Sequence, residues 1–105
     1  MSIHINCRSS IVSYVQAVVG DLHGQLQDLL TIFDLNGLPS PVKCYLFNGD
    51  MVDRGPNSVE IVLILLCFVL LFPQALHINR GNHETSYMNH VDGFEKECLD
   101  KYPLK

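Results

Sequence analysis

The sequence predicts an α/β fold in which parallel strands alternate with helices. Two observations lead to this prediction. Strand-like and helix-like segments alternate from residue 14 onward, in the order strand, helix, strand, helix, strand, helix. A polar, glycine-flanked motif follows each strand-like segment, and the intervals from Asp21 to Asp50 and from Asp50 to Asn82 are 29 and 32 residues. One strand–helix–strand unit takes about 30 residues, and consecutive units of this kind build a parallel sheet with right-handed crossovers.

Three short apolar segments are the predicted strands, at residues 14–19, 45–48 and 76–79. Each is short, rich in apolar residues and bounded by turn-forming residues, which is typical of a buried strand. Residues 1–13 are weakly patterned. We expect them to be a leader, either disordered or the remains of a longer N-terminal region, and we assign them no function. The predicted domain is therefore residues 14–105.

The first predicted helix begins near Leu26. Apolar residues recur there at intervals of three and four up to Phe33, which is the pattern of an amphipathic helix. The turn-forming residues 36–39 end it. A last, polar helix is expected at residues 89–101.

The second predicted helix runs from Val59 to Phe72, with Ser58 as its N-cap and Pro73 just beyond its end. Residues 61–72 are twelve consecutive uncharged, apolar residues. A membrane span needs about 20, and a run of 10 to 14 is more often a core helix. We therefore expect no membrane partner. A helix that is apolar all round should be buried on nearly all sides, and exposed hydrophobic surface is the alternative in a chain this short.

The amino-acid composition limits the kinds of fold and partner that the chain can have. The chain has 105 residues, 48% of them hydrophobic and 17% charged, which suits one small domain with its own core. With seven Lys and Arg and a net charge of −4, no basic surface is available for nucleic acid. The four cysteines lack zinc-site spacing, and the first 20 residues lack a secretory signal pattern. A cytoplasmic protein with reduced thiols is expected, with the nucleus as an alternative location.

The three motifs contain metal-ligand residue types. Asp21 and His23 are two positions apart after the first strand, so both side chains can reach one divalent ion. Asp50 follows the second strand and has two carboxylate oxygens with which to bridge two ions, and Asn82 offers an amide oxygen to the second ion. Since ligands bind beyond the carboxyl ends of strands in open parallel sheets, we expect these residues to meet at one edge. Carboxylate and imidazole suit manganese, with iron and zinc as alternatives.

Three further residues have plausible catalytic roles. Arg54 can bind phosphate oxygens through two parallel hydrogen bonds. His83 can protonate a departing alkoxide, and Asp53 can orient it. Two metal ions about 3.5–4 Å apart can activate a water for attack on phosphorus. Arg80 and Glu84 are interpreted as structural residues that close the loops.

The motifs together resemble the catalytic domain of the phosphoprotein phosphatases, the serine/threonine phosphatases within the calcineurin-like metallophosphoesterases. The likeness covers about residues 17–102, the N-terminal half of that domain, and includes Gly24-Gln25, Asp28-Leu29-Leu30, Gly37-Leu38-Pro39-Ser40, Phe47-Asn48-Gly49-Asp50 and Gly93-Phe94. It is strongest to the subgroup with tetratricopeptide or EF-hand regulatory segments.

The resemblance implies a partial metallophosphoesterase fold, a βαβαβα half with a parallel sheet. It implies hydrolysis of phosphoserine and phosphothreonine in proteins by a hydroxide activated by two metals, with phosphoproteins as substrates and regulatory subunits as partners. In the implied site, Asp21, His23 and Asp50 bind the first ion, and Asp50 and Asn82 bind the second. Arg54 holds the phosphate, while His83 and Asp53 form the proton-donor pair.

The sequence departs from the family pattern in two ways. The family's catalytic domain is more than twice as long, and its later half supplies two further histidines for the second ion and another phosphate-binding arginine. His90 and Asp92 also stand where the family usually has an arginine and a tyrosine. The alternative function is therefore a catalytically dead fragment that binds metal or competes for phosphatase partners. A membrane-associated fragment ranks last, because the apolar run is short.

Overall fold

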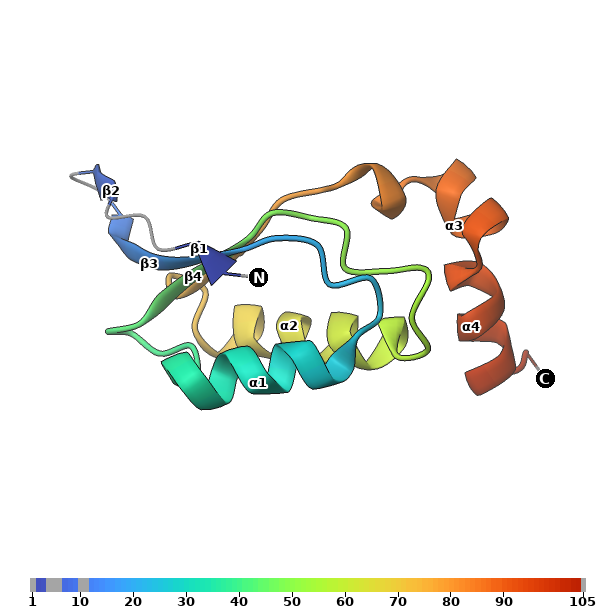
Figure 1. Ribbon diagram of the computed structural model, residues 1–105, viewed down its shortest axis with the longest axis horizontal. Coiled ribbons are helices and arrows are strands. Elements are labelled where there is room, and N and C mark those ends of the chain that lie inside the picture. Colours follow the sequence, from blue (N-terminus) through green and yellow to red (C-terminus); the bar gives the residue numbers. More distant parts are fainter. Residues whose placement is uncertain (1, 4–6, 10–11, 105) are drawn as a thin grey trace.

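The computed structural model describes residues 2–3, 7–9 and 12–104, which contain one five-stranded sheet (Figure 1). Its strands are β1 (Ser2–Ile3), β2 (Cys7–Ser9), β3 (Val12–Val19), β4 (Cys44–Phe47) and β5 (Leu76–Ile78). The three predicted strands are present and parallel, in the order β3, β4, β5, with Val19 opposite Phe47 and Phe47 opposite Ile78. β1 and β2 both pair antiparallel with β3. These two short strands lie in the segment whose sequence pattern was too weak to predict a structure, and β3 itself begins two residues earlier than expected.

Two helices cover one face of the sheet, α1 (Leu26–Asn36) and α2 (Ser58–Leu71). Figure 1 shows both on the same side of the strands, and α1 contacts α2. Right-handed crossovers between neighbouring strands in sequential order place their helices on one face. The core lies between this helix pair and the sheet, where the Phe33 ring of α1 meets Tyr45 and Phe47 edge-to-face, with ring centroids 5.7 and 6.5 Å apart.

The start of α2 differs from the prediction. Asn57, not Ser58, is at the N-cap, and it makes no side-chain capping bond. Glu97, from the last helix, takes this role, because its carboxylate accepts hydrogen bonds from the backbone N–H groups of Ser58 at 3.2 Å and Val59 at 2.6 Å. The Ser58 hydroxyl is instead buried, where it accepts a bond from the Asp53 backbone N–H at 3.1 Å.

The C-terminal helical region is also more divided than predicted. In place of one helix at 89–101 there are α3 (Ser86–Asp92) and α4 (Phe94–Lys101), preceded by a short 3-10 turn, η1 (Asn82–Glu84). Gly93 separates α3 from α4 with a left-handed backbone, φ +114°. Glycine adopts this conformation readily, so it ends one helix and redirects the chain into the next.

The apolar helix α2 is not buried on nearly all sides in the described part of the chain. Its outward side chains are 48–82% exposed, and they are Leu63, Leu66, Leu70 and Leu71. The prediction of near-complete burial is therefore wrong for this structure, and the alternative of exposed hydrophobic surface in a short chain is the one observed. No helix among residues 2–3, 7–9 and 12–104 is both long enough and apolar enough to cross a membrane.

Candidate active site

Three loops meet beyond the carboxyl ends of the parallel strands. They are residues 20–25 after β3, 48–57 after β4 and 79–85 after β5. Backbone hydrogen bonds join the first two, since the N–H groups of Leu22 and His23 both donate to the Asp50 carbonyl at 3.0 Å. The first loop and the Asp50 backbone are thus held in a fixed register, as the position of the motifs after the strands predicted.

Glycines allow the loops to approach at van der Waals contact. A Cβ atom at Gly81 would lie 2.2 Å from Oδ1 of Asp50, and one at Gly55 would lie 2.3 Å from the His23 carbonyl oxygen. Carbon and oxygen atoms do not approach this closely without displacement. Any side chain at either glycine would therefore push a predicted metal ligand out of place.

Hydrogen bonds to the Glu84 carboxylate join the third loop to the second. Its Oε2 accepts from the backbone N–H groups of Asp50 at 2.7 Å and Gly81 at 2.9 Å, while Oε1 accepts from Met51 at 2.8 Å. The Nε of Arg80 donates to the Glu84 carbonyl oxygen at 2.8 Å. The predicted structural roles of Arg80 and Glu84 are confirmed, and both fix the loop around Asp50.

The first predicted metal-ligand set comes together. One ligand atom each from Asp21, His23 and Asp50 lies within 4.8 Å of the others. Nδ1 of His23 is 2.8 Å from the Val52 carbonyl oxygen; since a carbonyl only accepts, Nδ1 carries the proton. Nε2, on the other side of the ring, faces Asp21, 3.6 Å from its Oδ2. A neutral imidazole oriented by a backbone carbonyl is the usual state of a histidine ligand, so these residues fit a divalent ion.

Asn82 lies directly against Asp50. In the orientation that satisfies both groups, its amide nitrogen donates to Oδ2 of Asp50 at 3.0 Å and to Oδ1 at 3.3 Å. The two residues predicted to share the second ion are thus neighbours. In the opposite orientation of the amide, its oxygen faces the carboxylate, and two neighbouring oxygens are what a shared cation would need.

His83 and Asp53 form a buried pair next to this cluster. Nδ1 of His83 is 2.9 Å from Oδ2 of Asp53, and the two residues are 3% and 2% exposed. Oδ1 of Asp53 accepts from the Phe94 backbone N–H at 2.9 Å, which fixes the carboxylate. The ring of His83 meets that of His23 edge-on, with centroids 4.7 Å apart. The pair therefore directs Nδ1 toward the carboxylate and leaves Nε2 for a substrate or water.

Arg54 is exposed at the same loop, immediately after Asp53. Its guanidinium makes no hydrogen bond or ion pair with any residue that the structure describes. Because nothing there neutralises it, the side chain is available to an anion that approaches the loops.

Backbone conformation marks the same residues independently of their chemistry. In the described ranges, four non-glycine residues have positive φ: His23 at +42°, Asp50 at +54°, Asp53 at +68° and Arg54 at +72°. All four belong to the predicted site. Left-handed conformations cost non-glycine residues about 1–2 kcal/mol and concentrate at functional sites.

The loops and their ligand set are those of a known family. The sequence profile of the "Calcineurin-like phosphoesterase" family matches residues 16–105. This chain belongs to the calcineurin-like phosphoesterases. The family resemblance predicted from the motifs is thereby confirmed.

Its relatives are serine/threonine phosphatases. The chain is 54% identical over 101 residues to human "Serine/threonine-protein phosphatase with EF-hands 2", covering 96% of this chain and 13% of that protein. It is 59% identical over 85 residues to human "Serine/threonine-protein phosphatase 5", covering 81% and 17%. Among solved structures, a Saccharomyces cerevisiae serine/threonine phosphatase similar to human PP5 superposes with a TM-score of 0.79 at 49% identity, covering 81% of this chain and 27% of that one. The chain thus spans less than a fifth of these curated relatives, and the structure has a partial phosphoesterase fold.

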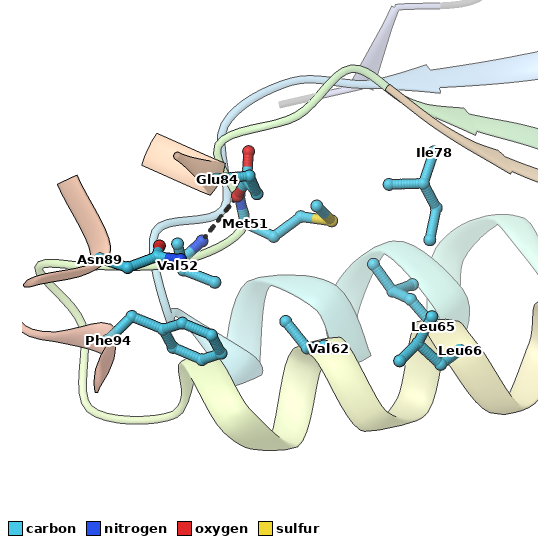
Figure 2. Close-up of a pocket in the computed structure, with 9 residues that line it drawn as sticks. All are labelled: Met51, Val52, Val62, Leu65, Leu66, Ile78, Glu84, Asn89 and Phe94. Atoms are coloured by element: carbon cyan, nitrogen blue, oxygen red, sulfur yellow. Dashed lines mark hydrogen bonds between the residues drawn. The ribbon is translucent and has the colours of Figure 1, made fainter. Parts of the chain in front are cut away.

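One pocket near the site is separate from it. A cavity of about 190 Å³ is lined mainly by apolar side chains from Met51 and Val52, α2, β5 and Phe94. Figure 2 shows these lining side chains. None of the seven predicted site residues lines it. The reaction chemistry is therefore expected on the open surface of the loops and not in this pocket.

Sequence reasoning missed one member of the site. Oδ2 of Asp92, at the end of α3, lies 3.5 Å from Nδ1 of His83. The sequence marked Asp92 only as a departure from the family pattern. Its position beside His83 depends on how α3 packs against η1, which the prediction of one helix at 89–101 could not place.

Proposed function

We propose that this chain supplies the metal-binding loops and the proton donor of a phosphatase that hydrolyses phosphoserine and phosphothreonine in proteins. One observation carries the proposal: the cluster of Asp21, His23 and Asp50 lies beside the buried Asp53–His83 pair, with the two imidazole rings 4.7 Å apart. Metal ligands next to an oriented imidazole are what phosphoester hydrolysis needs.

Two divalent ions are proposed as cofactors, manganese first, with iron or zinc as alternatives. Asp21, His23 and Asp50 would hold one, and Asp50 and Asn82 the other. When bound, such ions lower the pKa of water and supply hydroxide near neutral pH. The specific metals are chosen from the ligand types, a mixture of carboxylate, imidazole and amide.

The chain's own residues perform the remaining steps. Arg54, exposed and without an intramolecular partner among the described residues, would hold two phosphate oxygens and align the phosphorus with the loops. His83 would hold a proton at Nε2 and transfer it to the oxygen that leaves the phosphorus. Asp53 accepts from Nδ1 at 2.9 Å, so it fixes the orientation of the ring.

Phosphoproteins are the proposed substrates, and regulatory subunits are proposed partners. The names of the relatives support the first, because all those given above are serine/threonine phosphatases. The chain spans only 13–17% of the length of the two human relatives. We therefore propose hydrolysis for this chain and do not transfer it from the activity of those whole proteins.

A second candidate is a catalytically dead fragment that binds metal or competes for phosphatase partners. Within the described residues, Asp50 and Asn82 are the only predicted ligands for the second ion. A weakly held second ion would leave metal binding without turnover.

The test is manganese-dependent hydrolysis of p-nitrophenyl phosphate and of a phosphoserine peptide by the purified chain. Asp50→Asn keeps the shape of the side chain, and His83→Asn keeps a donor for Asp53, so both variants are expected to fold. Asp100→Asn, an exposed residue of α4, is the matched control. Turnover lost in the first two and kept in the third would support hydrolysis. Manganese binding with no turnover in the unmodified chain would favour the second candidate.

A further inference from the structure

We propose that Asp53, His83 and Asp92 form a second metal site, which takes a single zinc-like ion. The three side chains come from the loop after β4, from η1 and from the end of α3, and one ligand atom of each lies within 4.8 Å of the others. The site shares no residue with the cluster of Asp21, His23 and Asp50.

The distances fit a tetrahedral ion. Zinc bonds of about 2.0–2.1 Å in tetrahedral geometry place neighbouring ligand atoms roughly 3.3 Å apart. Nδ1 of His83 is 2.9 Å from Oδ2 of Asp53 and 3.5 Å from Oδ2 of Asp92. Two of the three ligand–ligand separations therefore already bracket the required value. The third can shorten by a rotation of Asp92, whose side chain is 35% exposed.

The chemistry of the three groups also fits. Nδ1 of His83 faces two carboxylate oxygens, both acceptors, so it carries a proton that a cation would replace. One imidazole and two carboxylates neutralise a divalent ion and are common ligands of zinc. The exposed Asp92 provides the side from which an ion reaches the two buried ligands.

Hydrogen bonds around Asp53 hold this buried carboxylate in the orientation that a metal ligand would need. Oδ1 of Asp53 is occupied by the Phe94 N–H at 2.9 Å, which leaves Oδ2 facing His83. The Asp53 backbone N–H is bound by the buried Ser58 hydroxyl at 3.1 Å. A ligating carboxylate held by outer hydrogen bonds is typical of metal sites.

The expected consequence, which rests on the proposed function, is inhibition by zinc. An ion bound at Nδ1 would occupy the ring that the proposed reaction uses, and its removal by a chelator should restore activity.

The test is a cobalt and zinc titration of the purified 105-residue chain. Visible absorption of Co²⁺ reports tetrahedral binding, and calorimetry gives the number of Zn²⁺ ions bound. Asp92→Asn keeps the size of an exposed side chain and is expected to weaken one site by roughly tenfold or more. Asp21→Asn should keep that site and lose the other, while Asp100→Asn should keep both. Equal stoichiometry and affinity in Asp92→Asn and the unmodified chain would overturn the proposal.

A measurement on the unmodified chain tests the same site without relying on the folding of Asp92→Asn. Zinc should shift the imidazole nitrogen resonances of His83 at Nδ1, and the shift should persist in Asp21→Asn. An unchanged Nδ1 resonance at saturating zinc would also overturn the proposal. Neither readout requires turnover, so a chain that binds zinc here but hydrolyses nothing would contradict only the proposed function.

Discussion

Strained backbone at four functional positions is the clearest feature at the scale of single residues. His23, Asp50, Asp53 and Arg54 all have positive φ, at a cost of the order of 1–3 kcal/mol each. The hydrogen bonds of the loops and the buried pair of Asp53 with His83 hold these conformations. Stability is thus given up so that metal-ligand and phosphate-binding groups point to one place.

Arg54 is expected to matter for substrate and not for folding. Its side chain has no partner within the part of the chain that the structure describes, so Arg54→Ala should change the free energy of unfolding by less than about 0.5 kcal/mol. Loss of charged hydrogen bonds to phosphate should raise the KM for p-nitrophenyl phosphate roughly tenfold or more. Arg54→Lys should restore little, because an ammonium cannot form the two-pronged contact. A KM unchanged in Arg54→Ala would show that the residue does not bind phosphate.

Gly81 offers a steric test of the site. A Cβ there would lie 2.2 Å from Oδ1 and 2.5 Å from the backbone nitrogen of Asp50. Gly81→Ala should therefore displace Asp50, weaken manganese binding and lower the free energy of unfolding by about 1–3 kcal/mol. The φ of Gly81 is −84°, so alanine brings no backbone strain and the effect isolates the clash. Unaltered manganese affinity, measured by calorimetry, would mean that the loops pack less tightly in solution than in this structure.

The site residues could be recognised from the sequence because each motif lies within a short stretch of the chain. Metal-ligand residue types and their glycines follow each strand directly, and strand ends in a parallel sheet share one edge. Asp92 was not recognised, since its approach to His83 at 3.5 Å depends on the angle between η1 and α3. Spacing along the chain does not specify that angle.

At the scale of secondary-structure elements, α4 docks on the start of α2. Glu97 replaces a local N-cap with a carboxylate from 38 or more residues away, and Lys101 Nζ contacts both Glu60 and Glu97, at 2.8 and 3.1 Å. This docking also brings Phe94 N–H to Asp53. The proton-donor pair therefore depends on helix packing as well as on the loops.

Glu97→Ala should weaken this docking. Two backbone N–H groups of α2 would lose their acceptor, and loss of a helix cap costs about 1–2 kcal/mol. We expect a fall of this size in the free energy of urea unfolding. Glu95→Ala, on the same helix but paired only with the exposed His90, is the control and should change it by less than about 0.5 kcal/mol. Equal stability in the two variants would contradict the capping role.

The ion pair between Lys101 and Glu60 predicts a pH dependence. The hydrogen bond from Lys101 lowers the pKa of Glu60 below its ordinary 4.5, and the bond to Glu60 raises the pKa of Lys101 above its ordinary 10.5. The Glu60 contribution is thus present above pH 4.5 and lost as the pH falls through its lowered pKa. The Lys101 contribution is present below pH 10.5 and lost as the pH rises through its raised pKa.

Urea midpoints measured across this range test the assignment. The difference between the unmodified chain and Glu60→Gln should be constant near neutral pH and disappear on acidification. Because both groups are largely solvated, the difference should be small and should shrink in high salt. A difference that persists at pH 2 would assign the effect to something other than the charge of Glu60.

Element prediction succeeded where the pattern was periodic and failed at long-range contacts. The apolar spacing in α1 predicted the residue at which that helix begins. The uncharged run in α2 predicted both ends of that helix to within one residue. The Ser58 cap was wrong because Glu97 comes from a distant helix. The single last helix was wrong because Gly93, at φ +114°, was read only as part of a helical segment.

At the scale of the whole molecule, the described chain is a sheet with helices on one face. α1 and α2 lie together on that face (Figure 1), and the outward leucines of α2 are exposed. The parallel direction of the three strands was predictable from their alternation with helices. The antiparallel β1 and β2 were not, because their sequence has no periodic signal.

This arrangement explains why three distant motifs act together. The sheet brings three loops to one edge, and glycine contacts and Glu84 hold them in register. The cluster of Asp21, His23 and Asp50 is the direct product. Its ability to hold a metal ion does not depend on turnover.

Manganese binding, followed by the loss of the free Mn²⁺ signal in electron paramagnetic resonance, tests this claim most directly. The purified chain and the Asp100→Asn control should bind Mn²⁺, whereas Asp50→Asn should bind at least about tenfold more weakly, because the missing charge removes the ligand predicted to serve both ions. Equal Mn²⁺ affinity in Asp50→Asn and the unmodified chain would contradict the claim that the three loops form a metal site.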